Sequence, residues 1–169
     1  MEGKFGAVIV AAGSSRRMGG QGSKVLEDLG GQPVLLYSFR TLASSPWVGE
    51  LAVVCREEDR PQVEALLAGK TDKPWVVAPG GQERQDSVLA GVAALDPDTP
   101  YLLIHDGARP FVTAEQVDAL CQDAVAYGAA TLAVPSKDTC KLSDGQGFVE
   151  QTADENGTYS VVISNTLDR

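Results

Sequence analysis

The chain has 169 residues, which is close to the length of one ordinary domain, so we expect a single domain with a sizeable core. Its 14 lysines and arginines stand against 23 acidic residues, and the net charge of −9 excludes a broad positive face for duplex nucleic acid. Hydrophobic residues make up 43%, which excludes a disordered acidic tail. The longest apolar run, residues 7–12, is too short to span a membrane.

The chain start and the cysteines favour a cytoplasmic protein. The first apolar run leads into a basic loop that contains Arg16 and Arg17, where a signal peptide would need a small-residue cleavage site. Cys55, Cys121 and Cys140 are far apart and form no ligand cluster with the one histidine, His105. We therefore expect buried free thiols, with neither a zinc site nor a disulfide framework.

Short apolar runs alternate with longer stretches of helical spacing. Strands are predicted, in chain order, at residues 7–12, 51–55, 75–78, 101–105 and 131–134. Helical stripes between them cover residues 35–42, 63–67 with Pro61 in the first turn, 88–95, and 117–124 with Thr113 as the N-cap. Four βα repeats predict an α/β fold with a doubly wound, mostly parallel, Rossmann-like sheet over residues 1–136.

The pattern changes after Pro135. Residues 137–169 carry turn signals and β-type runs at 147–149 and 159–163, and no helical pattern. Such a β-hairpin arm is marginal by itself, so it lies on the domain or packs against another subunit. We favour the second arrangement and expect a homodimer.

Ligands of open parallel sheets bind at the carboxyl ends of the strands, so the loops there carry the chemistry. The loop after the first strand is rich in glycine and serine, whose backbone N–H groups can approach phosphate oxygens, and Arg17 and Lys24 can add positive charge. Its spacing fits neither a P-loop nor G-x-G-x-x-G. The alternative for this segment alone is a surface loop with solvated arginines.

The loop after the third strand contains two glycines directly before a predicted helix. Gln82 or Ser87 could hydrogen-bond the edge of a base. The alternative is an ordinary loop, with Asp86 and Ser87 in a first helical turn that favours such residues.

The loop after the fourth strand begins with Asp106. A carboxylate at the end of a buried strand could hold Mg²⁺ bridging phosphate oxygens, or a ribose hydroxyl. Arg109 could bind a second phosphate. His105 points to the opposite face and is interpreted as structural.

Four segments together resemble a known family. They are A-A-G-x-x-x-R-M-G from Ala11 followed by Lys24, then G-G-x-x-R-x-x-S-V-x-x-G from Gly80, H-D-x-A-R-P from His105 and V-P-x-K-D-T-x-K from Val134. In this order they are similar to the 2-C-methyl-D-erythritol 4-phosphate cytidylyltransferases of the non-mevalonate isoprenoid pathway. The first segment is shared with many sugar-nucleotide transferases.

The resemblance implies transfer of CMP from CTP to methylerythritol phosphate, with release of pyrophosphate, by a homodimer that uses Mg²⁺. By motif position, Arg17 and Lys24 would act on the triphosphate as catalytic residues. Asp106 would hold the metal and the ribose. The other nucleotide-binding residues implied are Ala11, Ala12, Gly13, Ser14, Gly81, Gln82, Ser87 and Gly107, and the acceptor-binding residues are Arg109, Thr139 and Arg169, with the last two from the neighbouring subunit's arm.

This chemistry needs no nucleophilic side chain, because the acceptor phosphate is already an anionic nucleophile. The obstacle is the meeting of two polyanions and the charge that develops on the α-phosphate, which Arg17 and Lys24 would stabilise. Backbone carbonyls near Gly81 could accept from the cytosine amine and so select the base.

The sequence departs from the family in three places. Ser15 stands where a glycine is usual, the arm after Thr139 is longer, and the chain ends at Arg169 although family members continue with a further acceptor-binding threonine and lysine. This ending suggests a fragment or a shortened variant that keeps the CTP pocket and turns over poorly.

Three alternatives remain at this point. A ribitol-5-phosphate or other polyol-phosphate cytidylyltransferase has similar loops. An NAD-dependent oxidoreductase shares the fold, but the chain lacks its glycine fingerprint and has Cys55-Arg56, with no acidic residue, at the end of the second strand. The third alternative is a nucleotide-binding module without turnover.

Overall fold

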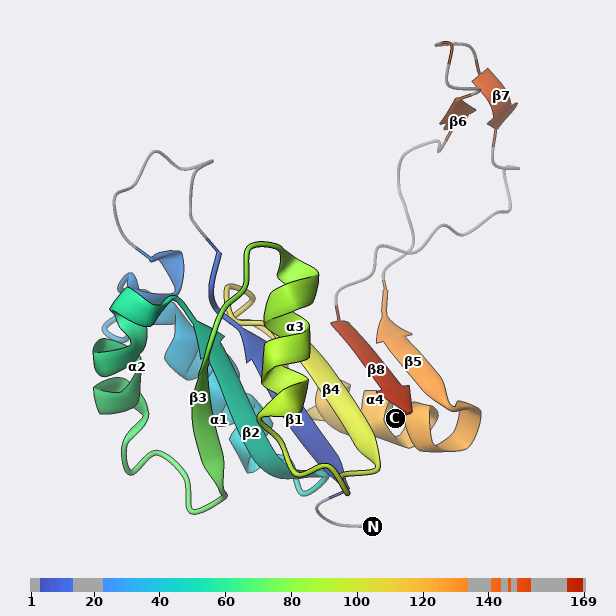
Figure 1. Ribbon diagram of the computed structural model, residues 1–169. Helices are drawn as coiled ribbons and strands as arrows, with labels where there is room; N and C mark the ends of the chain where they lie inside the picture. The colour runs from blue at the N-terminus through green and yellow to red at the C-terminus, as the bar shows by residue number, and fades with distance from the viewer. Residues whose placement is uncertain are drawn as a thin grey trace.

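The fold is built on a six-stranded sheet with the order β3-β2-β1-β4-β8-β5 (Figure 1). The computed structural model describes residues 4–13, 23–133, 141–143, 146, 149–152 and 164–168. The strands are β1 (Phe5–Val10), β2 (Val48–Cys55), β3 (Trp75–Pro79), β4 (Tyr101–Asp106), β5 (Ala129–Leu132) and β8 (Ser164–Asp168). Strands β1 to β4 pair in parallel, whereas β8 runs antiparallel to both β4 and β5.

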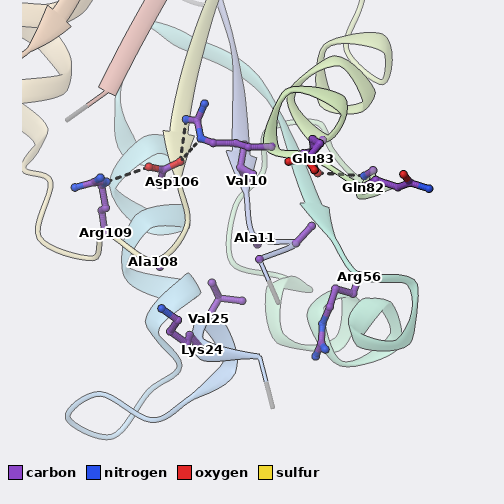
Figure 2. Close-up of a pocket in the computed structure, with 15 residues that line it drawn as sticks. Val10, Ala11, Lys24, Val25, Arg56, Gln82, Glu83, Asp106, Ala108 and Arg109 are labelled. Atoms are coloured by element: carbon purple, nitrogen blue, oxygen red, sulfur yellow. Dashed lines mark hydrogen bonds and ion pairs between the residues drawn. The ribbon is translucent and has the colours of Figure 1, made fainter. Parts of the chain in front are cut away.

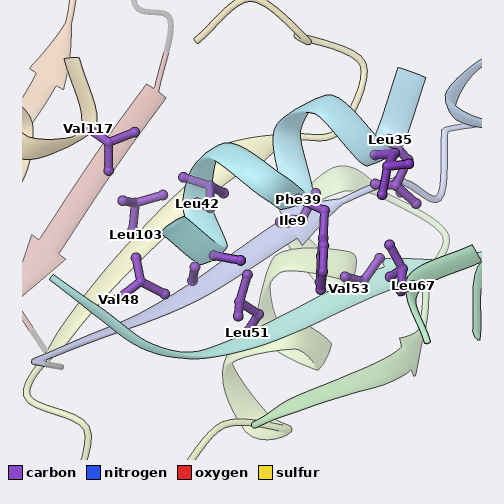
Figure 3. Close-up of a cluster of buried hydrophobic side chains, with 14 of the residues drawn as sticks. Ile9, Leu35, Phe39, Leu42, Val48, Leu51, Val53, Leu67, Leu103 and Val117 are labelled. Carbon is purple, nitrogen blue, oxygen red and sulfur yellow. The ribbon is translucent and has the colours of Figure 1, made fainter. Parts of the chain in front are cut away.

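Helices cover both faces of this sheet (Figure 1). They are α1 (Val34–Ser44), α2 (Arg60–Leu67), α3 (Arg84–Ala93) and α4 (Ala114–Tyr127), with short 3-10 turns η2 (Lys24–Leu26) and η3 (Glu57–Asp59). The larger buried cluster joins the sheet to α1, α2 and α4, and Phe39 and Leu42 lie at its centre (Figure 3). A smaller cluster under α3 includes Val8, Val54 and Ile104. The alternation of strand and helix confirms the predicted doubly wound α/β class.

The local signals behave as the sequence predicts. Thr113 caps α4, where its hydroxyl accepts from Gln116 N at 3.3 Å, and Pro61 lies in the first turn of α2. Cys55 and Cys121 are buried free thiols. Cys140 lies outside the described residues.

Two details of the sheet layers differ from the sequence prediction. Leu89, assigned to the apolar stripe of α3, has a side chain that is 66% exposed, because the helix packs through Gly91, Val88 and Val92 instead. The strand expected at 131–134 forms at Ala129–Leu132.

The expected arm forms in part. Strands β6 (Lys141–Ser143) and β7 (Val149–Thr152) pair antiparallel in a separate two-stranded sheet (Figure 1). The last strand, Ser164–Asp168, falls within the range 137–169 predicted as the arm, but it belongs to the main sheet between β4 and β5. The β-type run at 159–163 lies outside the described residues. Within the part of the chain that the structure describes, no helix is long and apolar enough to cross a membrane.

Candidate functional site

A cavity of about 1080 Å³ lies where the carboxyl ends of β1, β2, β3 and β4 meet (Figure 2). Each strand contributes its last residue or the loop that follows it, and η2 contributes one wall. The lining residues are Val10, Ala11, Ala12, Gly13, Lys24, Val25, Arg56, Gly81, Gln82, Glu83, Arg84, Ser87, Asp106, Ala108 and Arg109.

Backbone hydrogen bonds hold these strand ends together. Ala11 N donates to Val54 O at 2.7 Å, Gly107 N donates to Val10 O at 2.9 Å, and Gly80 N donates to Cys55 O at 2.8 Å. The loops after β1, β3 and β4 are therefore anchored to their neighbours before any ligand is present.

Gly80 lets the third loop lie against the first. A Cβ atom on this residue would stand 2.3 Å from the Cβ of Ala12, far inside the van der Waals contact distance. Any larger residue would push the two loops apart. The glycine in this motif thus has a packing reason.

Ser87 shapes the loop that precedes α3. Its side chain is buried, its hydroxyl oxygen accepts from Gly81 N at 3.1 Å, and its hydroxyl donates to Glu83 O at 3.3 Å. Both hydrogen bonds of the Ser87 hydroxyl lie within the loop. Ser87 can therefore affect a bound base indirectly, by fixing the position of the Gly81 backbone. Gln82 is exposed at the cavity wall.

Asp106 sits between two arginines. Its Oδ1 accepts from Arg84 Nη2 at 2.9 Å and from Arg84 Nε at 3.2 Å, and its Oδ2 accepts from Arg109 Nε at 3.1 Å. Burial by itself would raise the pKa of Asp106, but the hydrogen bonds from Arg109 and Arg84 outweigh it and hold the pKa below its usual value. The carboxylate is therefore ionised at neutral pH.

His105 contacts the turn that carries Asp106 and Arg109 from the buried side of the sheet. Its ring is 1% exposed, and its Nε2 lies 3.2 Å from the carbonyl oxygen of Arg109. Burial lowers the pKa of His105, so the ring is neutral at pH 7. This placement agrees with the structural role predicted from the sequence.

Arg56 lines the opposite wall, at the end of β2. Its guanidinium pairs with Asp59, with Nε 2.7 Å from Oδ2, and with Glu58, with Nη1 2.6 Å from Oε1. These pairs hold the arginine on the loop that follows its own strand.

The structure brings together most of the residues predicted from the sequence. The cavity lining includes Ala11, Ala12, Gly13, Lys24, Gly81, Gln82, Ser87, Asp106 and Arg109. Gly107 is not part of this lining; it packs against Ile9 and Leu35, where a Cβ atom would come within 3.2 Å and 3.3 Å of their side chains. Ser14, Arg17, Thr139 and Arg169 lie outside the described residues.

Sequence reasoning missed Arg84 and Arg56. The first lies within the quoted motif G-G-x-x-R, so its signal was present, but nothing in the sequence indicates its partner. The second follows a predicted strand, and the rule that places ligands at strand carboxyl ends would have included it.

The fit of a metal ion can be judged from the donor set. The described residues contain no group of three or more histidine, cysteine or acidic side chains that could hold a metal by themselves. Asp106 does offer a hard carboxylate at the cavity wall, and Mg²⁺ commonly binds one or two carboxylates together with substrate phosphates. The site thus fits a metal ion that arrives with a phosphorylated ligand.

Comparisons with known proteins agree on one family. The family model described as 2-C-methyl-D-erythritol 4-phosphate cytidylyltransferase matches residues 5–168. A protein of that name from Caldanaerobacter subterraneus is 38% identical over 96% of this chain, and one from Pelotomaculum thermopropionicum is 42% identical over 88%. The chain spans 73% and 63% of the length of these two relatives.

A solved structure gives the same picture. The crystal structure of 4-diphosphocytidyl-2C-methyl-D-erythritol synthase from Anaerococcus prevotii superposes with a TM-score of 0.84 at 28% identity. The match covers 97% of this chain and 70% of that one.

Proposed function

Because the chain belongs to the 2-C-methyl-D-erythritol 4-phosphate cytidylyltransferase family, we propose that its cavity binds CTP for transfer of CMP to methylerythritol phosphate, with release of pyrophosphate. The observation that carries this proposal is that Lys24, Asp106 and Arg109 line one cavity with the Gly81 loop. A strongly acidic protein thereby presents cations at one edge of its sheet.

The nucleotide lies, in this proposal, against the loops after β1 and β3. Ala11, Ala12, Gly13 and Ser14 bind it through the backbone, and Gly81 and Gln82 receive the base, with Ser87 fixing the loop and Gly107 closing the strand end. A backbone carbonyl that faces the base accepts a hydrogen bond from the cytosine amine. Uracil has the acceptor O4 at that position, so the carbonyl would stay unpaired and uracil would be rejected.

The cations lower the barrier to the transfer. Lys24, with Arg17, stabilises the charge that develops on the α-phosphate as pyrophosphate leaves. Arg109 holds the acceptor phosphate close to this point, together with Thr139 and Arg169 of the neighbouring subunit, so that two polyanions can approach each other.

Mg²⁺ is part of the proposal. Asp106 would hold it, and the ion would supply positive charge that neutralises the phosphates of CTP. The geometry in support is the ionised carboxylate at the cavity wall.

The proposal includes a homodimer in the cytoplasm. The β6–β7 hairpin forms its own sheet and offers edges that another subunit can cover. Light scattering during size-exclusion chromatography tests the dimer, and a monomer at micromolar concentration would contradict it.

Family membership favours this activity over the alternatives. It decides against an NAD-dependent oxidoreductase, and the relatives that match are named for methylerythritol phosphate. Catalytic turnover would distinguish this enzyme from a module that only binds the nucleotide.

Pyrophosphate release tests the proposal. We expect release with CTP, Mg²⁺ and methylerythritol phosphate together, and a lower rate with UTP or with ribitol 5-phosphate. Lys24→Ala should slow the reaction by roughly 100-fold or more, because a lost transition-state contact of this kind costs about 3 kcal/mol. Lys70→Ala, at an exposed lysine that does not line the cavity, is the control. CTP binding without release would support the module instead.

A further inference from the structure

Both carboxylate oxygens of Asp106 are already occupied in the structure. Arg84 holds Oδ1 through Nη2 and Nε, at 2.9 and 3.2 Å, and Arg109 holds Oδ2 at 3.1 Å. A divalent cation needs at least one of these lone-pair directions. Oδ1 already accepts from two donors and Oδ2 from one, so a cation can bind Oδ1 only after Arg84 has left it.

Arg109 is the less able of the two to leave. It lies three residues after Asp106 on the same turn, and its backbone N donates to Asp106 O at 3.0 Å. The carbonyl oxygen of Arg109 is also held by His105 and Ser38. The backbone that carries this guanidinium is thus fixed next to the carboxylate.

Arg84 reaches Asp106 from a different element. It is the first residue of α3, and its side chain is 59% exposed. The turn below it is fixed, since Glu83 N donates to the Asp86 carboxylate at 3.0 Å. A rotation of the Arg84 side chain alone would free Oδ1, with no change in the backbone.

We propose that Arg84 is a positioning residue that occupies Oδ1 of Asp106 in the nucleotide-free protein and yields this oxygen to the divalent cation that arrives with CTP. The proposal rests on the function proposed above. The cation and Arg84 compete for the same oxygen, and the phosphates of CTP offer Arg84, which lines the cavity, another anionic partner.

Because the ion and Arg84 compete for Asp106, the presence of Arg84 changes how much the metal improves CTP binding, and this change can be measured. When the ion displaces Arg84, the cost of breaking the ion pair is subtracted from the gain in CTP affinity that the metal provides. Removing the arginine removes this cost. The ratio of the Kd of CTP without metal to the Kd with metal should then rise.

Isothermal titration of CTP in EDTA and in saturating Mg²⁺ measures this ratio without any turnover. In Arg84→Gln we expect the ratio to rise about two- to fivefold, the size of an ion pair that is partly exposed. Arg60→Gln removes an exposed pair with Glu64 on α2 and should leave the ratio unchanged. An unchanged or lower ratio in Arg84→Gln overturns the proposal.

A second pair of variants separates exchange from simple charge. In an Asp106→Asn background the side chain carries no negative charge, so its ion pair with Arg84 is lost and it binds a divalent cation weakly; adding Arg84→Gln should then leave the ratio the same. A rise there would show that Arg84 acts on CTP as a charge, and it would overturn the exchange. If the parent protein binds no CTP in either buffer, the proposed function itself fails, an outcome distinct from CTP binding with an unchanged ratio.

Discussion

The imidazole of His105 lies 3.3 Å from the hydroxyl of Ser38, measured from Nε2 to Oγ, deep between β4 and α1. Both side chains also reach the carbonyl oxygen of Arg109, at 3.2 and 3.3 Å. Through these contacts, helix α1 stabilises the turn that places Asp106 and Arg109 at the cavity wall.

Ser38 should contribute to stability through this network. Ser38→Ala removes the hydroxyl and leaves buried partners with fewer hydrogen bonds, so we expect the free energy of unfolding to fall by about 1–3 kcal/mol. Urea denaturation measures it. Ser44→Ala, at an exposed serine at the end of the same helix, is the control and should change it by less than about 0.5 kcal/mol. Equal effects of the two variants would contradict the role of Ser38.

His105 should make stability depend on pH. Burial holds its pKa below the usual 6.5 in the folded protein, so below neutral pH the unfolded chain binds more protons than the folded one. Stability is full above pH 6.5 and is lost as the pH falls below it. Denaturation between pH 7.5 and 5 should show a decline that is smaller in His105→Gln. His105 is the single histidine of the chain, which makes the assignment direct. The same slope in both proteins would refute it.

Gly91 is where α3 approaches the sheet. A Cβ atom there would lie 2.3 Å from Val8 Cγ1 and 2.8 Å from Val54 Cγ2. Gly91→Ala should therefore lower the melting temperature, with a cost of about 1–3 kcal/mol from overpacking. Leu89→Ala on the exposed side of the same helix is the matched control. A variant Gly91→Ala as stable as the parent would mean that the helix can move outward without penalty.

The two described cysteines should be inert in the folded protein. Burial raises the pKa of Cys55 to about 11 and that of Cys121 to about 12, so both remain thiols at pH 7.5. Iodoacetamide should label the peptides of these residues only after unfolding, as read by mass spectrometry. Fast labelling of either peptide in native buffer would contradict the buried placement.

The sequence predicted the parallel core of the sheet because its strands are apolar on consecutive positions. Strands β1 to β4 are recognisable from such local runs, and the rule for strand carboxyl ends then gathers Lys24, Gly81 and Asp106 into one cavity. β8 has no such run. Its residues Ser164–Asp168 form a strand because β4 and β5 offer partners on both sides, which is a non-local cause.

The contact between Arg84 and Asp106 also escapes sequence reasoning. The two residues are 22 positions apart, and their pairing depends on where the first residue of α3 lies in space relative to the end of β4. The exposure of Leu89 has a similar origin, because Gly91 sets which side of the helix touches the sheet.

Calorimetric titration of CTP in the presence of Mg²⁺ tests most directly whether this cavity is a nucleotide site. The account predicts saturable binding with one CTP per chain, weakened by Lys24→Ala by a smaller factor than the rate of turnover is and unaffected by Lys70→Ala. Absence of CTP binding in the parent protein would contradict it.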